Sequence, residues 1–114
     1  MIEKIIYDYL KDALDVPVYF ELPEEKNIPF VVVEKTGSAR DNYILEATIA
    51  IQSYADTLFN AAALNETVKD AMLSGLYEQD QIGHVGLNSD YNFTDTALKA
   101  YRYQAVFNIN YYSE

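Results

Sequence analysis

The sequence predicts one α+β domain over residues 1–114, in which two helices cover a largely antiparallel sheet of four to five strands. Three observations predict this class. The stretches Tyr43–Tyr54 and Lys99–Tyr112 alternate apolar and polar residues, as strands with one buried face do. Two other stretches repeat apolar residues at helical spacing. No repeat, low-complexity tract or interdomain linker divides the chain.

The first expected element is an N-terminal helix. Apolar residues recur every three or four positions from Ile2 to Leu14, with acids and lysines between them. This spacing predicts an amphipathic helix of about three turns. Pro17 should stop it, because the residue before a proline avoids the helical region.

Three strands are expected next. Val18–Leu22 is a short candidate, and Pro29–Val33 is a β-branched run typical of a strand buried on both faces. The polar segment Thr36–Asn42 indicates a loop, which joins this run to Tyr43–Tyr54 most simply as a hairpin.

A second helix should follow at Leu58–Leu73, capped by Asp56 or Thr57 and terminated by Gly75. Its alanine cluster would allow close approach to a sheet.

The remaining chain should form two strands. The first is short, lies near Ile82–Leu87 and is interrupted by glycines, with turns at Asn88–Asp90 and Asn92–Asp95. The second is Lys99–Tyr112. The expected order is therefore helix, three strands, helix, two strands.

The two long strands are too long for the body that carries them. At about 3.3 Å per residue they reach about 40–45 Å, whereas a compact domain of this size has a diameter of about 34 Å. Either the strands bend sharply or their ends project. Projecting ends need a neighbour, because bare edges and apolar tips invite pairing. We therefore expect a subunit that lies beside copies of itself.

The composition excludes several classes of protein. The net charge of −10 and the scattered basic residues argue against binding nucleic acid through its phosphates. The absence of cysteine excludes disulfides and thiolate zinc sites. No run approaches the ~20 apolar residues of a membrane span, and residues 1–14 lack the pattern of a signal peptide.

No set of residues predicts catalysis, a metal or a cofactor. There is no nucleophile elbow and no glycine-rich phosphate loop. His84 is the only histidine and would need carboxylates alone as zinc co-ligands. Asn88, Asp90 and Asn92 have the alternate spacing of a calcium loop, but the glycine and terminal glutamate of that loop are missing. We therefore expect a protein that is not an enzyme.

Two features are better interpreted as subunit contacts. Arg40 and Asp41 place opposite charges at the expected hairpin tip, within reach of a neighbour. Tyr111 and Tyr112 place one ring on each face of the last strand, so one of them should lack a partner within the monomer. The predicted subunit interface comprises Gly37, Ser38, Arg40, Asp41, Asn42, Tyr43, Tyr111 and Tyr112.

The order of elements resembles that of a known family. An N-terminal amphipathic helix and an acidic connection precede Ile28–Val33. A long strand then ends in Gln52–Asp56 at the start of a helix, and Ala100–Phe107 begins the C-terminal strand. In order and length, nearly the whole chain resembles the tail terminator and tail completion (head–tail joining) proteins of long-tailed bacteriophages.

The resemblance implies a role in virion assembly. Such proteins form rings, usually hexamers, at the head-proximal end of the tail tube, and are assembled in the host cytoplasm. Their partners are copies of themselves, the tail tube protein and the head-completion or connector protein. DNA passes through the ring, and an acidic wall would repel its phosphates. The family has no catalytic residues or cofactor to carry over.

Two other functions stay open at this point. An acidic inhibitor that mimics DNA would need dense rows of carboxylates, whereas the acids here are interrupted by lysines and apolar residues. A small α+β domain that binds a ligand in a tyrosine-lined pocket and dimerises through its sheet is the other alternative.

Overall fold

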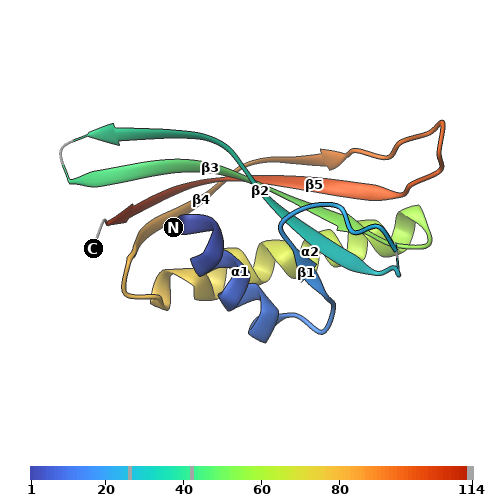
Figure 1. The fold of residues 1–114 in the computed structure, drawn as a ribbon, viewed down its shortest axis with the longest axis horizontal. Coiled ribbons are helices and arrows are strands. Elements are labelled where there is room, and N and C mark those ends of the chain that lie inside the picture. Colours follow the sequence, from blue (N-terminus) through green and yellow to red (C-terminus); the bar gives the residue numbers. More distant parts are fainter. Residues whose placement is uncertain (26, 42, 113–114) are drawn as a thin grey trace.

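The computed structural model describes residues 1–25, 27–41 and 43–112 (Figure 1). The elements along the chain are α1 (Ile2–Ala13), β1 (Val18–Tyr19), β2 (Phe30–Asp41), β3 (Ile44–Tyr54), α2 (Leu58–Gly75), the 3-10 turn η1 (Leu76–Glu78), β4 (Ile82–Asn92) and β5 (Arg102–Tyr112). The predicted α+β class and the predicted order of elements are confirmed.

The five strands form one sheet in the order β1-β2-β3-β5-β4. All neighbouring strands are antiparallel except the short β1, which runs parallel to β2. The central pair β3 and β5 is regular from Ile44 opposite Tyr112 to Tyr54 opposite Arg102. Both helices lie on the same face of the sheet (Figure 1). The opposite face, which no described helix covers, is called the uncovered face below.

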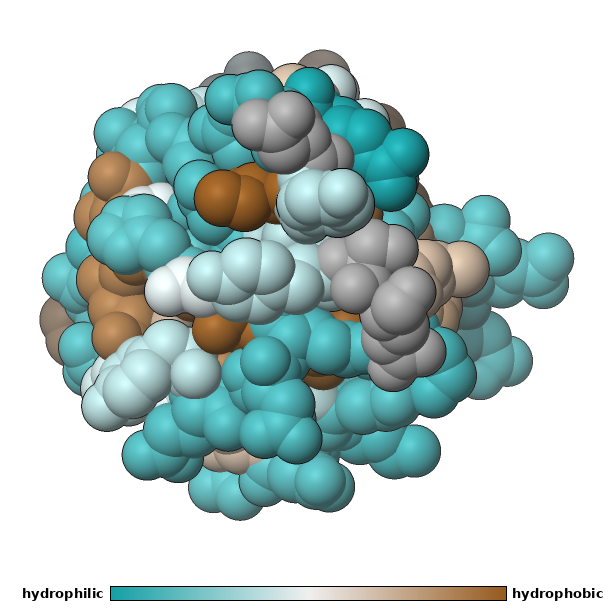
Figure 2. Space-filling view, turned by 90° about the vertical axis from the view of Figure 1, so that its left-hand side faces the viewer, coloured by the Kyte–Doolittle hydropathy of each residue, from teal (hydrophilic) through white to brown (hydrophobic). Residues whose placement is uncertain are grey.

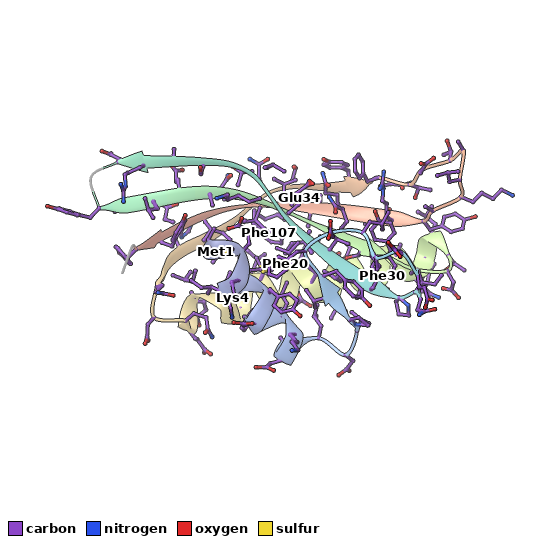
Figure 3. The ribbon with its side chains drawn as sticks, viewed as in Figure 1. Met1, Lys4, Phe20, Phe30, Glu34 and Phe107 are labelled. Atoms are coloured by element: carbon purple, nitrogen blue, oxygen red, sulfur yellow. The ribbon has the colours of Figure 1, made fainter. Side chains whose placement is uncertain are left out.

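The core lies between the helices and the sheet. Ile6 and Leu10 of α1 and Val68 and Met72 of α2 are buried, which follows from their helical spacing. The alternation predicted for the two long strands is also confirmed over their central parts, where every second residue is buried against the helices: Ala47, Ile49 and Ile51 of β3 and Ala105, Phe107 and Ile109 of β5. Phe107 of β5 points toward this core, whereas Glu34 of β2 belongs to the uncovered face (Figure 3).

The prediction of a loop at Thr36–Asn42 is wrong over residues 36–41, the part of this segment that the structure describes. Strand β2 continues to Asp41, which pairs with Ile44, and the ladder is interrupted only by a bulge at Thr36. The polar residues can be a strand here because the hairpin extends beyond the helices, so neither face needs an apolar row. Asn42 lies outside the described residues.

The prediction for β4 is wrong in its middle. The strand runs through the segment Asn88–Asp90, where a turn was expected, and two bulges absorb extra residues between Ile82 and His84 and between Leu87 and Ser89. The turn expected at Asn92–Asp95 lies further along the chain. Asn92 is the last residue of β4, Asp95 forms a bridge with Ala100, and residues 96–99 form the turn. Within the predicted segment, the Thr94 N–H donates to Asn92 Oδ1 at 3.0 Å. Strand β1 ends earlier than predicted, at Tyr19, and β5 begins later than predicted, at Arg102.

The N-terminus of α2 is capped as the sequence predicts, since Thr57 Oγ1 accepts from the Asn60 N–H at 3.0 Å. Its C-terminus differs, because Gly75 is the last helical residue and not the one after it. Tyr9 of α1 lies directly over this glycine and donates its hydroxyl to the Ala71 carbonyl at 2.6 Å. A Cβ atom at position 75 would lie 2.0 Å from that hydroxyl, so the glycine provides space.

The molecule is elongated, with extents of 44 × 25 × 24 Å. The long strands project from the body, which is the second of the two outcomes expected from their length. The β2–β3 hairpin and the end of β5 extend past the helices at one end, at the left of Figure 1. The loop from Phe93 to Tyr101 and the start of α2 lie at the other end. The two ends therefore carry different segments of the chain.

Candidate assembly interface

The hairpin end exposes aromatic and aliphatic side chains. Tyr43 is 88% exposed, and Ile44 and Tyr112, which are cross-strand neighbours, are each about half exposed. Seen end-on, this part of the molecule shows apolar patches among hydrophilic residues (Figure 2). Exposed large apolar side chains at a projecting tip are typical of contact surfaces.

The structure brings most of the predicted interface residues together at this end. Arg40 and Asp41 are the last residues of β2, opposite Leu45 and Ile44. Tyr111 packs at the margin of the core, and Tyr112 lies on the other face of β5, as their adjacency predicts.

Two predicted residues lie away from the tip, and a third is not described. Gly37 and Ser38 lie further along the paired strand, opposite Thr48 and Ala47, and not at the tip. Asn42 is outside the described residues. The interface assignment itself stays a prediction.

A hollow of about 520 Å³ lies beneath the hairpin, between the start of α1, the start of β3 and the end of β5. Its lining mixes apolar residues such as Ile2, Leu45 and Tyr111 with charged ones. Glu3 Oε1 is buried there without a hydrogen bond and is 3.8 Å from the Lys35 ammonium. The hollow is therefore amphipathic, with an acceptor that has no donor among the described residues.

The opposite end carries a groove that the sequence did not reveal. Two adjoining hollows of about 510 and 250 Å³ share Ile28, Ala55 and Asp56 in their linings. Leu98, at the rim of the smaller hollow, is 75% exposed. These residues come from three connections far apart in the chain. Ile28, Ala55 and Leu98 are apolar residues outside any periodic pattern, which is the only signal the sequence offers.

On the uncovered face, a row of hydrogen-bonded side chains crosses the sheet. Gln52 of β3 donates to Gln104 of β5 at 2.6 Å, and Gln104 donates to the Tyr91 hydroxyl of β4. Both glutamines are buried although no helix covers them. The row explains their burial, since buried amides need hydrogen-bond partners.

The neighbouring row of the same face is aromatic. Phe30 stacks on Tyr54 with ring centroids 4.6 Å apart, and Arg102 donates to the Tyr54 hydroxyl at 2.9 Å. The Arg102 guanidinium also lies 4.3 Å from the centre of the Phe93 ring. The Arg102 Nε also donates to the Phe93 carbonyl at 2.5 Å, and within the part of the chain described Arg102 forms no ion pair. Such cation–π contacts add about 0.5–2 kcal/mol.

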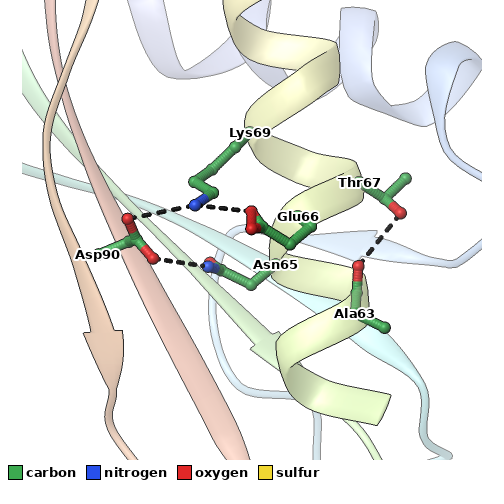
Figure 4. Close-up of polar contacts among 6 residues, drawn as sticks. All are labelled: Ala63, Asn65, Glu66, Thr67, Lys69 and Asp90. Carbon is green, nitrogen blue, oxygen red and sulfur yellow. Dashed lines mark hydrogen bonds and ion pairs between the residues drawn. The ribbon is translucent and has the colours of Figure 1, made fainter. Parts of the chain in front are cut away.

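A polar cluster fastens α2 to β4 (Figure 4). The Lys69 ammonium lies 2.6 Å from Glu66 and 3.3 Å from Asp90, and the Asn65 amide donates to Asp90 at 3.3 Å. The hydrogen bond to Glu66 raises the pKa of Lys69 above its ordinary value of 10.5; Asp90 adds to the increase, against the opposing effect of burial. The cluster is satisfied within the chain, except for the buried Asn65 Oδ1, and its role is structural.

Over residues 1–25, 27–41 and 43–112, no group of three or more His, Asp or Glu side chains is placed to hold a metal ion. His84 lies exposed on β4 opposite Asn110. Asp90, one of the residues at calcium-loop spacing, is directed to α2 instead. No helix in the described part is both long and apolar enough to span a bilayer.

No protein-family model matches the chain, and no curated protein matches it. Among solved structures, a chain from the virion of a native gene transfer agent (GTA) particle is similar to it, with a TM-score of 0.70 and 14% sequence identity. The match covers 98% of this chain and 95% of that one. At this identity the likeness is one of fold, and it extends over nearly the full length of both chains.

Proposed function

We propose that this chain is a non-catalytic virion assembly protein of the tail terminator or tail completion type. It forms a ring at the head-proximal end of a phage or phage-like tail tube. The ring is a hexamer, as is usual in the family that the chain resembles. The observation that carries the proposal is the fold shared with a chain of a GTA virion particle along 98% of this chain. The strand pattern and order of elements support the same assignment independently.

In this proposal the ring stops growth of the tube and presents a surface to the head-completion or connector protein. Its contacts are between subunits and with the tube, through the projecting strand ends. A few buried aromatic and aliphatic side chains carry most of the affinity in such interfaces. Tyr43 and Ile44 at the hairpin end have the required chemistry and exposure.

The charge of the chain fits passage of DNA through the ring. The uncovered face of the sheet carries the exposed acids Glu34, Asp41 and Glu46, and its one arginine, Arg102, is engaged by aromatic rings. Binding to phosphates depends on lysine and arginine contacts. A ring lined by this face would let DNA pass without holding it.

The test is a tube-capping assay with purified tail tube protein from the same genome. The chain has no cysteine, so Glu24→Cys, in an exposed connection, provides one attachment point for a gold label. We expect label at one end of each tube in electron micrographs, and tubes that stop elongating. The cysteine-free chain treated with the same label is the control.

Tubes that elongate at an unchanged rate, with no label at their ends, would refute the proposal. A deletion of the gene gives a second readout. We expect tailless heads and tubes of uncontrolled length, and normal particles from the deletion would contradict the assignment.

A further inference from the structure

We infer that copies of this chain join head to tail, with the hairpin tip of one copy inserted into the end groove of the next. The hairpin tip is defined as Arg40, Asp41, Tyr43 and Ile44. The end groove is defined as Ile28, Ala55, Asp56, Leu98 and Lys99. The inference rests on the self-association in the proposed function, and it names the two surfaces that make it.

The two surfaces lie at opposite ends of a molecule 44 Å long. A contact between two different surfaces repeats in one direction, so it produces a ring where the rotation closes. A two-fold dimer would instead use the same patch on both copies. A contact between the hairpin tip and the end groove, which are different surfaces at distant ends, therefore favours a ring over a two-fold dimer.

The apolar parts of the two surfaces are complementary in form. The hairpin tip is convex and presents Tyr43, which is 88% exposed. The end groove is concave, with hollows of about 510 and 250 Å³ bordered by the exposed Ile28 and Leu98. A tyrosine inserted into such a hollow buries about 150–250 Å² and keeps its hydroxyl at the wet rim.

The charges of the two surfaces are complementary as well. The hairpin tip has Arg40 and Asp41 on opposite faces of one strand, and the groove has Asp56 and Lys99 in the lining of one hollow. Among the described residues, none of these four forms an ion pair, although this acidic chain offers carboxylates to any cation. Asp56 Oδ1 accepts a hydrogen bond from the Asn60 amide at 2.8 Å, and its charge is not paired. Pairing Arg40 with Asp56 and Asp41 with Lys99 would give each of the four charges an opposite charge. Complementary charges of this kind fix orientation and exclude other partners.

The rim of the groove is already ordered. Asp95 Oδ1 accepts hydrogen bonds from the Ala97 and Leu98 N–H groups at 3.1 and 3.2 Å. A backbone bridge between Asp95 and Ala100 closes the same loop. Lys99 has a positive φ of 52°, which turns the chain at this point. An ordered rim lowers the entropy lost on binding.

A charge swap tests the pairing. Arg40→Glu and Asp56→Lys should each weaken self-association by about tenfold or more, since like charges then face each other. The double variant should recover most of the loss. Sedimentation velocity over a range of concentrations measures the association. Asp12→Lys, which makes the same charge change on the exposed side of α1, is the control and should have little effect. A double variant no better than the worse single variant would overturn the contact.

Tyr43→Ser and Tyr77→Ser provide a second comparison. Both tyrosines are exposed, but Tyr77 lies in η1 and belongs neither to the hairpin tip nor to the end groove. We expect only Tyr43→Ser to lower association, with unchanged unfolding by urea. Equal behaviour of the two variants would refute a role for the tip.

Crosslinking covers the case in which the chain associates only on the tube. With Tyr43→Cys and Leu98→Cys together in the otherwise cysteine-free chain, mild oxidation in the presence of tail tubes should give a ladder of covalent oligomers. Either cysteine alone should give none. Dimers from Tyr43→Cys alone would indicate a two-fold contact and overturn the inference. A ladder without tube capping would sustain the contact and refute the proposed function, whereas capping without a ladder would do the reverse.

Discussion

Replacement of Gly75 by alanine tests the reason given for this glycine. Its backbone φ of −128° is open to any residue, so conformation does not require glycine. The requirement is space, because a Cβ atom would lie 2.0 Å from the Tyr9 hydroxyl. Alanine must therefore displace Tyr9 and break its 2.6 Å hydrogen bond to the Ala71 carbonyl, which links α1 to α2.

The expected change in the free energy of unfolding combines two losses and one gain. Loss of the hydrogen bond costs about 0.5–1.5 kcal/mol, and overpacking costs about 1–3 kcal/mol. Replacement of a glycine within a helix by alanine raises the free energy of unfolding by about 0.5–1 kcal/mol. We therefore expect Gly75→Ala to lower the free energy of unfolding by about 1–3 kcal/mol.

Urea unfolding of a double-mutant cycle with Tyr9→Phe measures this. Tyr9→Phe removes the clashing oxygen and leaves a nearest ring carbon at 3.1 Å from the Cβ position. In that background, Gly75→Ala should cost much less than in the native chain. If Gly75→Ala raises the stability of the native chain, as helix propensity alone would give, the steric argument is refuted.

Three further predictions concern stability. Asp90→Ala should cost about 1–2 kcal/mol in urea unfolding, because the Lys69 ammonium loses an acceptor, whereas Asp12→Ala at an exposed site should have little effect; equal losses would contradict the structural role of the cluster. Burial raises the pKa of Tyr9 above its ordinary value of 10.0, so the protonated phenol is favoured in the folded state. The stability advantage of the native chain over Tyr9→Phe should be constant below about pH 10 and shrink above it, as the unfolded state ionises first; an advantage that grows with pH would contradict this. Phe107→Ala should lower the free energy of unfolding by about 3–5 kcal/mol, because Phe107 is fully buried in the core. A smaller loss of stability, measured by calorimetry, would mean that the core closes over the cavity.

Sequence patterns revealed the elements that have one buried face. Strands β3 and β5 alternate because the helices cover one side of each, and the stripe of α1 repeats for the same reason. The outer half of β2 is polar because solvent reaches both of its faces, so it has no period and was predicted as a loop. The middle of β4 was missed because bulges break its alternation.

The hairpin end could be predicted in part, whereas the end groove could not. The strand lengths exceed the diameter of the domain, and this simple comparison predicts projecting ends. The groove depends on strand order, because β5 lies between β3 and β4 and places its preceding loop beside Ile28 and Ala55. No local pattern encodes that order, which pairs residues between 48 (Tyr54 with Arg102) and 68 (Ile44 with Tyr112) positions apart.

The glutamine row has a consequence for how the strands find their alignment. Aliphatic neighbours tolerate a shift of one strand along another, provided that the faces are kept. Gln52 and Gln104 do not, because a slip of two residues keeps the faces but separates the two amides, and a buried, unpaired amide costs about 1–3 kcal/mol. The hydrogen bond between these two residues thus fixes the register of the central β3–β5 ladder. A neighbouring aliphatic residue could be substituted alone, whereas a substitution of Gln52 or Gln104 would require a matching substitution of the other.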